Sequence, residues 1–175
     1  MSTRRGWSRR AVLAAAPALM ASAARADGLT RTELFTATDD GVRIHVCEVA
    51  PPAPRGPPLI LVHGARAPGV ASFDLAVPGG SLAADLARRL NRRVYLPDAR
   101  GYGGSQRPAA MDLPPERSRP LSRAHEVVRD LDATTRLASK RNDGARVGLL
   151  GWATGACGQA GTPPCARKPS RAWRP

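Results

Sequence analysis

Residues 59–64 read Leu59-Ile60-Leu61-Val62-His63-Gly64, four consecutive aliphatic side chains followed at once by a histidine and a glycine. A continuous apolar run of this length is typical of a strand that is buried on both faces of a parallel sheet. Residues 147–150 (Val-Gly-Leu-Leu) have the same character and also run into a glycine. We therefore predict two fully buried strands, at residues 59–62 and 147–150.

Helical patterns separate these two strands. Residues 81–90 carry a leucine at every fourth position behind Ser81, a residue that can cap the first turn of an amphipathic helix. Residues 122–141 place acids and bases three to four apart around a few apolar positions, which predicts a second helix. Another short strand is predicted at 93–98. This alternation predicts an α/β fold with a doubly wound, mostly parallel sheet, whose functional loops lie at the carboxyl ends of the strands.

One further strand is predicted ahead of residue 59. Residues 42–46 alternate apolar and polar side chains, which is typical of a strand with one buried face. His45 falls on the polar side of this pattern, so we expect its ring to be solvated. His125 falls on a face of the predicted second helix.

The net charge of +13 arises from 27 Lys and Arg against 14 Asp and Glu in 175 residues. A charge of this size suggests nucleic acid or anionic lipid as a partner. Its distribution argues otherwise, because five of the excess charges lie in residues 1–26 and four in 156–175, which leaves +4 for residues 27–155. No recognition helix or aromatic-basic pattern accompanies that remainder, so nucleic-acid binding is the least favoured function.

Residues 1–26 have the layout of an export signal. Two arginine pairs precede an uncharged, Ala-rich stretch at 11–24 that is too short for a stable membrane anchor. Ala24 and Ala26 supply the small side chains that a signal peptidase requires, which predicts cleavage after Ala26. Residues 8–13 (Ser-Arg-Arg-Ala-Val-Leu) resemble the twin-arginine signal of bacteria, and a Sec signal with extra arginines is the alternative. Both predict that the export machinery is a partner and that the mature chain is periplasmic or secreted.

The cysteines and histidines form no recognisable framework. Of three cysteines, Cys157 and Cys165 lie in the C-terminal tail, so Cys47 stands alone in the predicted domain. No histidine lies at zinc-site spacing from a cysteine pair. We expect no disulfide framework, no metal site and no cofactor.

Three motifs, taken in order, resemble the N-terminal half of the α/β-hydrolase family. Residues 59–64 are similar to its third strand with the His-Gly turn that follows. Residues 98–105 (Asp-Ala-Arg-Gly-Tyr-Gly-Gly-Ser) are similar to the family's Asp-x-Arg-Gly-x-Gly-x-Ser loop. Residues 151–155 (Gly-Trp-Ala-Thr-Gly) stand where the family has its Gly-x-Ser-x-Gly nucleophile elbow. The resemblance covers residues 40 to 155 and implies an α/β-hydrolase fold that is truncated after the elbow.

The resemblance also implies a role for each matching residue. The elbow is a strained strand-to-helix turn that lifts a serine hydroxyl above the sheet. Here Ala153 occupies the apex, and a methyl group can neither attack a carbonyl nor be activated by a base. An oxyanion hole is implied from the backbone N–H groups of Ala65 and Thr154. The other matching positions, which support the motifs, are His63, Gly64, Asp98, Arg100, Gly151 and Gly155.

The family's order places an acid and then a histidine after the elbow. His45, His63 and His125 all precede it, so no complete catalytic triad can be assembled from this sequence. A sheet cut after the elbow strand would also leave a strand of the buried type as an open edge, which is an aggregation liability.

Residues 156–175 have no apolar periodicity and no acidic side chain. Their codons, regrouped in a shifted frame, permit a continuation that resembles the helix following a hydrolase elbow. We therefore divide the chain into a twin-arginine-type signal peptide at 1–26, half of an α/β-hydrolase domain at 27–155, and a tail at 156–175 that is a candidate frameshift product.

Three functions remain open. The first is an exported hydrolase of the ester or related acyl class, inactive as written, whose intact form would act on a small-molecule substrate. The second is a hydrolase-fold protein that binds a small molecule without hydrolysing it, because Ala153 is inert in either frame. The third is a non-functional truncated product.

Overall fold

The computed structural model describes residues 27–117 and 122–156. These residues form a five-stranded sheet in the order β1-β2-β4-β3-β5. Its strands are β1 (Thr30–Ala37), β2 (Arg43–Ala50), β3 (Leu59–Val62), β4 (Val94–Pro97) and β5 (Gly148–Gly151). The helices are α1 (Gly69–Phe73), α2 (Leu82–Leu90) and α3 (Ala124–Lys140), with a 3-10 turn at Ala109–Asp112.

The direction of β2 is opposite to that of the other strands. It pairs antiparallel with β1 and with β4, whereas β3 pairs parallel with both β4 and β5. Parallel strands need crossover connections, which are supplied here by α1 and α2 between β3 and β4, and by α3 between β4 and β5. The predicted α/β class, with a doubly wound and mostly parallel sheet, is confirmed.

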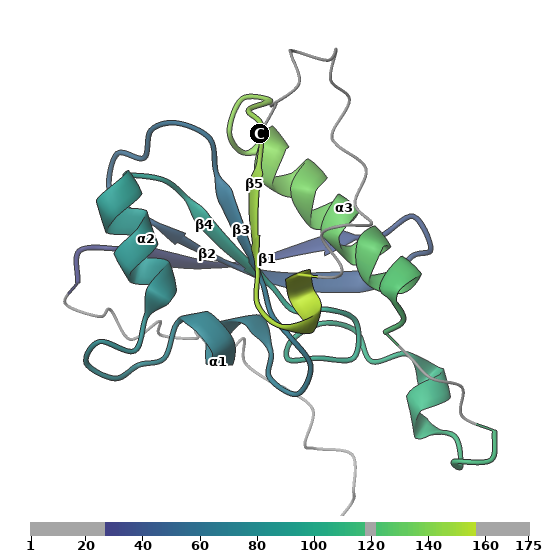
Figure 1. Ribbon diagram of the computed structural model, residues 1–175. Helices are drawn as coiled ribbons and strands as arrows, with labels where there is room; N and C mark the ends of the chain where they lie inside the picture. Colours follow the sequence, from purple (N-terminus) through teal and green to yellow (C-terminus); the bar gives the residue numbers. More distant parts are fainter. Residues whose placement is uncertain (1–26, 118–121, 157–175) are drawn as a thin grey trace, which may run out of the picture.

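Apolar layers cover both faces of the sheet. Figure 1 shows α1 and α2 on one side and α3 on the other. Leu61 of β3 packs with Phe73 on the side of α1 and α2, while Ile60 packs with Leu131 on the side of α3. Successive side chains of a strand point to opposite faces, so both faces of β3 must be apolar. This is why residues 59–62 are aliphatic at every position.

α2 begins at the capping residue that the sequence predicts. Ser81 Oγ accepts a hydrogen bond from the Ala84 N–H at 2.9 Å and caps α2, as predicted. Asn91 closes the same helix in a left-handed conformation, with φ of 51°. Within the two described stretches, the helices are all too short or too polar to cross a membrane.

The prediction for His45 was wrong. Its side chain is buried, with 9% of the residue exposed, because β2 is covered on both faces. The loop at 98–105 packs against the face that carries His45, and Ser105 Oγ accepts a hydrogen bond from the His45 N–H at 2.8 Å. The strand β1, which no pattern predicted, adds Glu33 beside the ring. On the polar side of residues 42–46, His45 therefore makes buried polar contacts, whereas Arg43 is exposed.

Candidate active site

The segment 151–155 forms a sharp turn at the carboxyl end of β5. Gly151 is the last residue of the strand, and residues 154–156 are already helical. Between them Ala153 has φ of 52°, in the left-handed region that residues with a Cβ rarely adopt. The chain thus passes from strand to helix through one strained residue, which is the backbone course that the sequence resemblance implies.

Gly155 allows this turn to lie directly against β3. A Cβ at this position would stand 2.6 Å from the carbonyl oxygen of His63 and would also collide with that of Val62. Gly64 lies on the other side of the turn, where an added Cβ would approach the Ala153 methyl group to 3.1 Å. The close packing of the two loops therefore depends on small residues at both positions.

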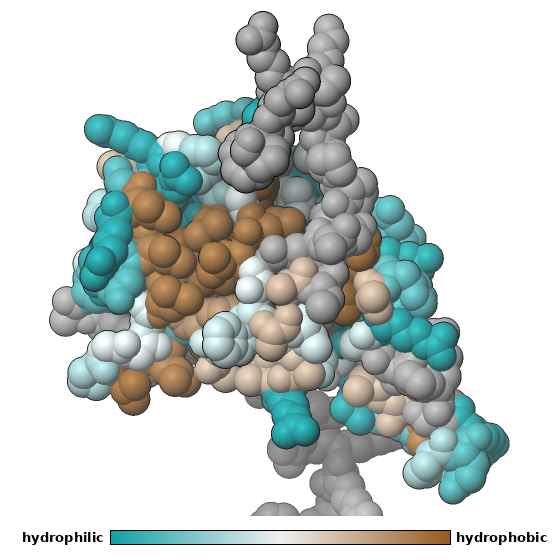
Figure 2. Space-filling model, in the orientation of Figure 1, coloured by the Kyte–Doolittle hydropathy of each residue, from teal (hydrophilic) through white to brown (hydrophobic). Residues whose placement is uncertain are grey.

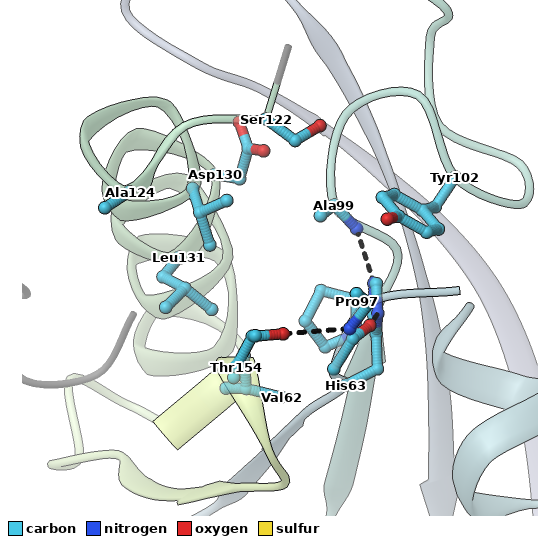
Figure 3. A pocket seen from close by; sticks show the side chains of 14 residues that line it. Val62, His63, Pro97, Ala99, Tyr102, Ser122, Ala124, Asp130, Leu131 and Thr154 are labelled. Atoms are coloured by element: carbon cyan, nitrogen blue, oxygen red, sulfur yellow. Dashed lines mark hydrogen bonds between the residues drawn. The ribbon is translucent and has the colours of Figure 1, made fainter. Parts of the chain in front are cut away.

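Ala65 and Thr154, the two predicted oxyanion residues, lie in contact. The Ala65 N–H donates a hydrogen bond to Thr154 Oγ1 at 2.8 Å, which Figure 3 shows as a dashed line. An anionic ligand oxygen at Ala65 would have to displace this hydroxyl. The structure brings the residues together, and their role as an oxyanion hole stays a prediction.

His63 is held through both ring nitrogens. Nε2 accepts a hydrogen bond from the Ala99 N–H at 3.0 Å, so the proton of the neutral ring lies on Nδ1, which donates to the Gly64 carbonyl at 2.6 Å. The ring also contacts Tyr102, with ring centroids 5.0 Å apart. His63 therefore joins the loops after β3 and β4, and neither nitrogen is free to act as a base.

Asp98 organises the loop after β4. Its carboxylate accepts hydrogen bonds from the N–H groups of Gly69 (2.7 Å) and Gly104 (2.9 Å) and lies 2.8 Å from His45 Nδ1. Burial acts to raise the pKa of Asp98, but the hydrogen bonds outweigh it and lower that pKa. The same contact with Asp98, against the effect of burial, raises the pKa of His45, whose other nitrogen contacts Glu33. His45 thus lies between two carboxylates, which favour its protonated form.

Arg100 connects the same loop to two other segments. Its side chain is buried and lies 2.8 Å from a carboxylate oxygen of Asp130 in α3 and 2.8 Å from one of Asp40 in the β1–β2 turn. The hydrogen bond from Arg100 lowers the pKa of Asp40, whereas burial keeps the pKa of Asp130 raised despite the same partner. The charged residues of the 98–105 motif thus shape the loop through internal contacts.

A pocket of about 450 Å³ opens between this loop, the first turns of α3 and the elbow. Figure 3 shows Leu131 of α3, Tyr102 of the β4 loop and Thr154 of the elbow around it. Its size suits a small molecule, and its place at the carboxyl ends of parallel strands is where α/β folds bind ligands. Over the described parts of the chain, no three His, Cys, Asp or Glu side chains gather in a way that could hold a metal ion.

Several pocket residues were not predicted. Tyr102 lies inside a quoted motif, so its place beside the His-Gly turn was open to inference from that loop. Asp130 and Leu131 depend on how α3 packs across the sheet, which no local pattern determines. The predicted signal at 1–26 and residues 157–175, with Cys157 and Cys165, lie outside the described residues.

The sequence profile of the alpha/beta hydrolase family matches residues 59–167, which is more than half of the chain. No curated protein matches significantly. Among solved structures, the chain is similar to an esterase from Pyrococcus furiosus, with 17% identity and a TM-score of 0.54 over 75% of this chain and 46% of the esterase. It is similar to an epoxide hydrolase mutant from Vigna radiata, with 22% identity and a TM-score of 0.51 over 74% of this chain and 33% of that one.

An alpha/beta hydrolase from Novosphingobium aromaticivorans is similar too, with 19% identity and a TM-score of 0.51 over 74% of this chain and 38% of that one. At these identities the likeness concerns the fold, and the chain spans less than half the length of each of these proteins. Together with the family profile, it establishes that the chain belongs to the α/β-hydrolase family.

Proposed function

We propose that this chain is a non-hydrolysing member of its family, which binds a small, neutral and largely apolar molecule in the pocket beside the elbow. The observation that carries the proposal is the methyl group of Ala153 at the strained apex of the turn. Acyl transfer through a covalent intermediate needs a nucleophilic atom at that position, and a methyl group offers none. His63 cannot compensate as a base, because both of its nitrogens are engaged.

The polar groups of the pocket favour a neutral ligand. Among its described lining residues, Asp130 carries a charge that is already paired with Arg100. Thr154 accepts a hydrogen bond from Ala65, which leaves its own hydroxyl proton for a ligand oxygen. The rest of the lining is mainly apolar, so a molecule with an apolar body and one carbonyl or ether oxygen fits the chemistry of the site.

The test is binding without turnover. In saturation-transfer NMR, p-nitrophenyl butyrate should bind saturably while no p-nitrophenol is released above the buffer rate, and a fluorophosphonate probe should leave the protein unlabelled. Ala124→Trp narrows the pocket at its rim and should remove binding, whereas His125→Trp, one residue away and outside the lining, should retain it. Turnover of the ester, or binding that Ala124→Trp leaves intact, would contradict the proposal.

Acyl hydrolysis by a longer form of the protein is a second candidate. The retained backbone of the elbow favours it, because Ala153 and Gly155 keep a geometry whose known use is to present a nucleophile. Ala153→Ser should then react with a fluorophosphonate probe if a base and an acid are supplied elsewhere in that form. Transcript sequencing across codons 150–175 tests the frameshift directly, and an unambiguous single frame ending at Pro175 would remove it.

We propose further that residues 1–26 direct export. The arginine pairs, the uncharged stretch and the small residues before Asp27 support this. The exported protein should begin at Asp27 by N-terminal sequencing. Arg9→Lys together with Arg10→Lys should block the twin-arginine route, whereas a Sec signal would tolerate both changes because the positive charge is kept.

A further inference from the structure

Two backbone N–H groups in the loop after β3 are occupied by side-chain hydroxyls. The Ala65 N–H donates to Thr154 Oγ1 at 2.8 Å. The Arg66 N–H donates to the Tyr102 hydroxyl at the longer distance of 3.5 Å, and Arg66 has φ of 82°, in the left-handed region. Successive N–H groups around a left-handed residue can form a concavity of the kind that binds anions in proteins. In this loop a neutral hydroxyl oxygen is therefore the acceptor at each N–H group where an anionic oxygen would otherwise fit.

Both hydroxyls belong to residues that line the pocket, although they come from different segments. Thr154 directly follows the apex of the elbow, and Tyr102 lies in the loop after β4, where its ring contacts His63. Figure 3 shows the two side chains at the wall of the same cavity. A hydroxyl that accepts a hydrogen bond still has its own proton to donate. A ligand in the pocket therefore meets hydroxyl groups in front of the N–H groups of the loop.

Close packing of the elbow against this loop limits access to the Ala65 N–H. An added Cβ at Gly64 would stand 3.1 Å from the Ala153 methyl group and 3.6 Å from Thr154 Oγ1. The space between the loop and Thr154 is therefore too narrow for a ligand oxygen. Such an oxygen reaches the N–H group only if the Thr154 side chain rotates away and gives up its hydrogen bond. Thr154 thus competes with any ligand for this donor.

The rest of the site offers an anion no compensating charge. Among the described residues that line the pocket there is no lysine or arginine, and the carboxylate of Asp130 is paired with Arg100. Figure 2 shows that the surface over the elbow, at the lower end of β5 in Figure 1, is of intermediate to apolar character. A carboxylate that enters such a site loses its hydration and needs several donors or a cation in return, whereas one hydroxyl suffices for a neutral carbonyl oxygen.

We propose that Thr154 and Tyr102 make the pocket selective for neutral ligands over anionic ones, because their hydroxyls occupy the N–H groups of residues 65 and 66. This selectivity presupposes a pocket that binds small molecules, so it rests on the proposed function and assigns two residues that set the ligand class of the same site. Thr154 contributes more than Tyr102, since its hydrogen bond is the shorter of the two. Without the two hydroxyls, both N–H groups would be free to bind the oxygens of a carboxylate.

The ligands 4-phenylbutyramide and 4-phenylbutyrate test this selectivity, because they match in size and shape and differ in charge. In calorimetric titrations at neutral pH, the original chain should bind the amide at least roughly tenfold more tightly than the carboxylate. Thr154→Ala exposes the Ala65 N–H and should reduce this ratio roughly tenfold, whereas Thr154→Ser keeps the hydroxyl and should keep the ratio. Tyr102→Phe should reduce it less, and Thr32→Ala, at an exposed threonine of β1 outside the lining, is the control. An unchanged ratio in Thr154→Ala, or an equal loss in Thr154→Ser, would overturn the proposal.

NMR gives a second measurement, which does not depend on ligand affinity in the original chain. Amide exchange at Ala65 should quicken in Thr154→Ala and stay slow in Thr154→Ser, once circular dichroism has verified that both variants are folded. Addition of 4-phenylbutyrate should shift the Ala65 amide resonance in Thr154→Ala alone. If the original chain binds neither ligand, the proposed function fails, and an Ala65 shift gained in Thr154→Ala would still support the role of Thr154. Equal binding of both ligands by the original chain would leave that function standing and overturn the selectivity.

Discussion

Among the strands that the structure describes, the two outermost are built from different chemistry. β1 has eight residues, among them Arg31, which pairs with Asp74 at 2.7 Å, and Glu33, which contacts His45. β5 has four uncharged residues, and a glycine at 155 lets the turn after it rest on the backbone of β3. One of these strands is therefore fixed by charged side chains, and the other by backbone pairing and close approach.

This difference separates two ways in which a strand can be stabilised. Charged side chains on β1 fix it to its own sheet and discourage pairing with another chain. Main-chain contacts at β5 give the strand a place in the sheet without charged side chains. We call β1, β2 and the loops that contact them the charged side, and β3, β5 and the elbow the β5 side. Removal of a charged side chain should therefore lower the stability of the charged side, whereas addition of side-chain atoms should lower the stability of the β5 side.

The largest effect is expected from Arg100→Ala, on the charged side. The substitution leaves Asp130 buried without its cation and removes the buried cation that pairs with Asp40 in the β1–β2 turn. Loss of one partner from a buried ion pair typically costs about 3–5 kcal/mol. Urea unfolding followed by circular dichroism measures the change. Arg88→Ala is the control, because the Arg88–Asp85 pair is exposed and its loss should stay within about 0.5 kcal/mol.

Gly155→Ala should show the next largest effect, on the β5 side. The new Cβ would collide with the carbonyl oxygens of Val62 and His63, so the turn or β3 must shift, at a cost of about 2–3 kcal/mol. Gly144→Ala separates this steric cost from backbone strain, because Gly144 has φ of 75° but open space around it. That variant should lose about 1 kcal/mol in the same urea experiment. Equal losses in the two variants would show that close approach does not stabilise the β5 side.

The sequence predicted best what local patterns decide. β3 was found because a strand covered on both faces needs apolar residues throughout, and α2 because Ser81 and its leucines indicate a capped, amphipathic helix. β5 was found by the same apolar pattern, but the prediction that it is fully buried was wrong, because Leu150 is 44% exposed. The strained turn at Ala153 was expected from the resemblance of residues 151–155 to the family's nucleophile elbow, and the structure confirms its backbone course. In each case the signal lies within a short stretch of the sequence, even where the contacts behind it, such as that of Gly155 with His63, join distant residues.

Contacts between distant residues explain what the sequence did not predict. β1 shows no clear alternation, and its place depends on pairing with β2 and on charges such as Glu33 beside His45. The buried position of Arg100 depends on Asp40 and Asp130, which are 60 and 30 residues away. Likewise, nothing local indicated that the Thr154 hydroxyl would meet the Ala65 N–H.

A smaller effect is expected in the pH dependence of the free energy of unfolding, and it arises from His45 on the charged side. The contact with Asp98 raises the pKa of His45 above the ordinary value of 6.5. The stability that this contact provides is fully present below about pH 6.5 and is lost as the pH rises through the raised pKa of the folded state. The free energy of unfolding should therefore fall over that window. His45→Gln should remove this decline, and His125→Gln, at an exposed histidine, should retain it.

The smallest effect concerns the rate at which thiols are alkylated. It compares Cys47, in the interior next to β1, with a thiol introduced at position 150 of β5. Burial raises the pKa of the Cys47 thiol to about 12, so its thiolate is scarce and its alkylation near pH 8 should be roughly 1000-fold slower than that of an ordinary thiol. The thiol introduced by Leu150→Cys lies at a position that is 44% exposed and should react at the ordinary rate. Peptide mass spectrometry after iodoacetamide treatment measures both rates in one chain, and guanidinium should equalise them by unfolding the protein. Rapid labelling of Cys47 in the native protein would mean that the strands beside β1 open readily, and the charged side would then be the less protected of the two.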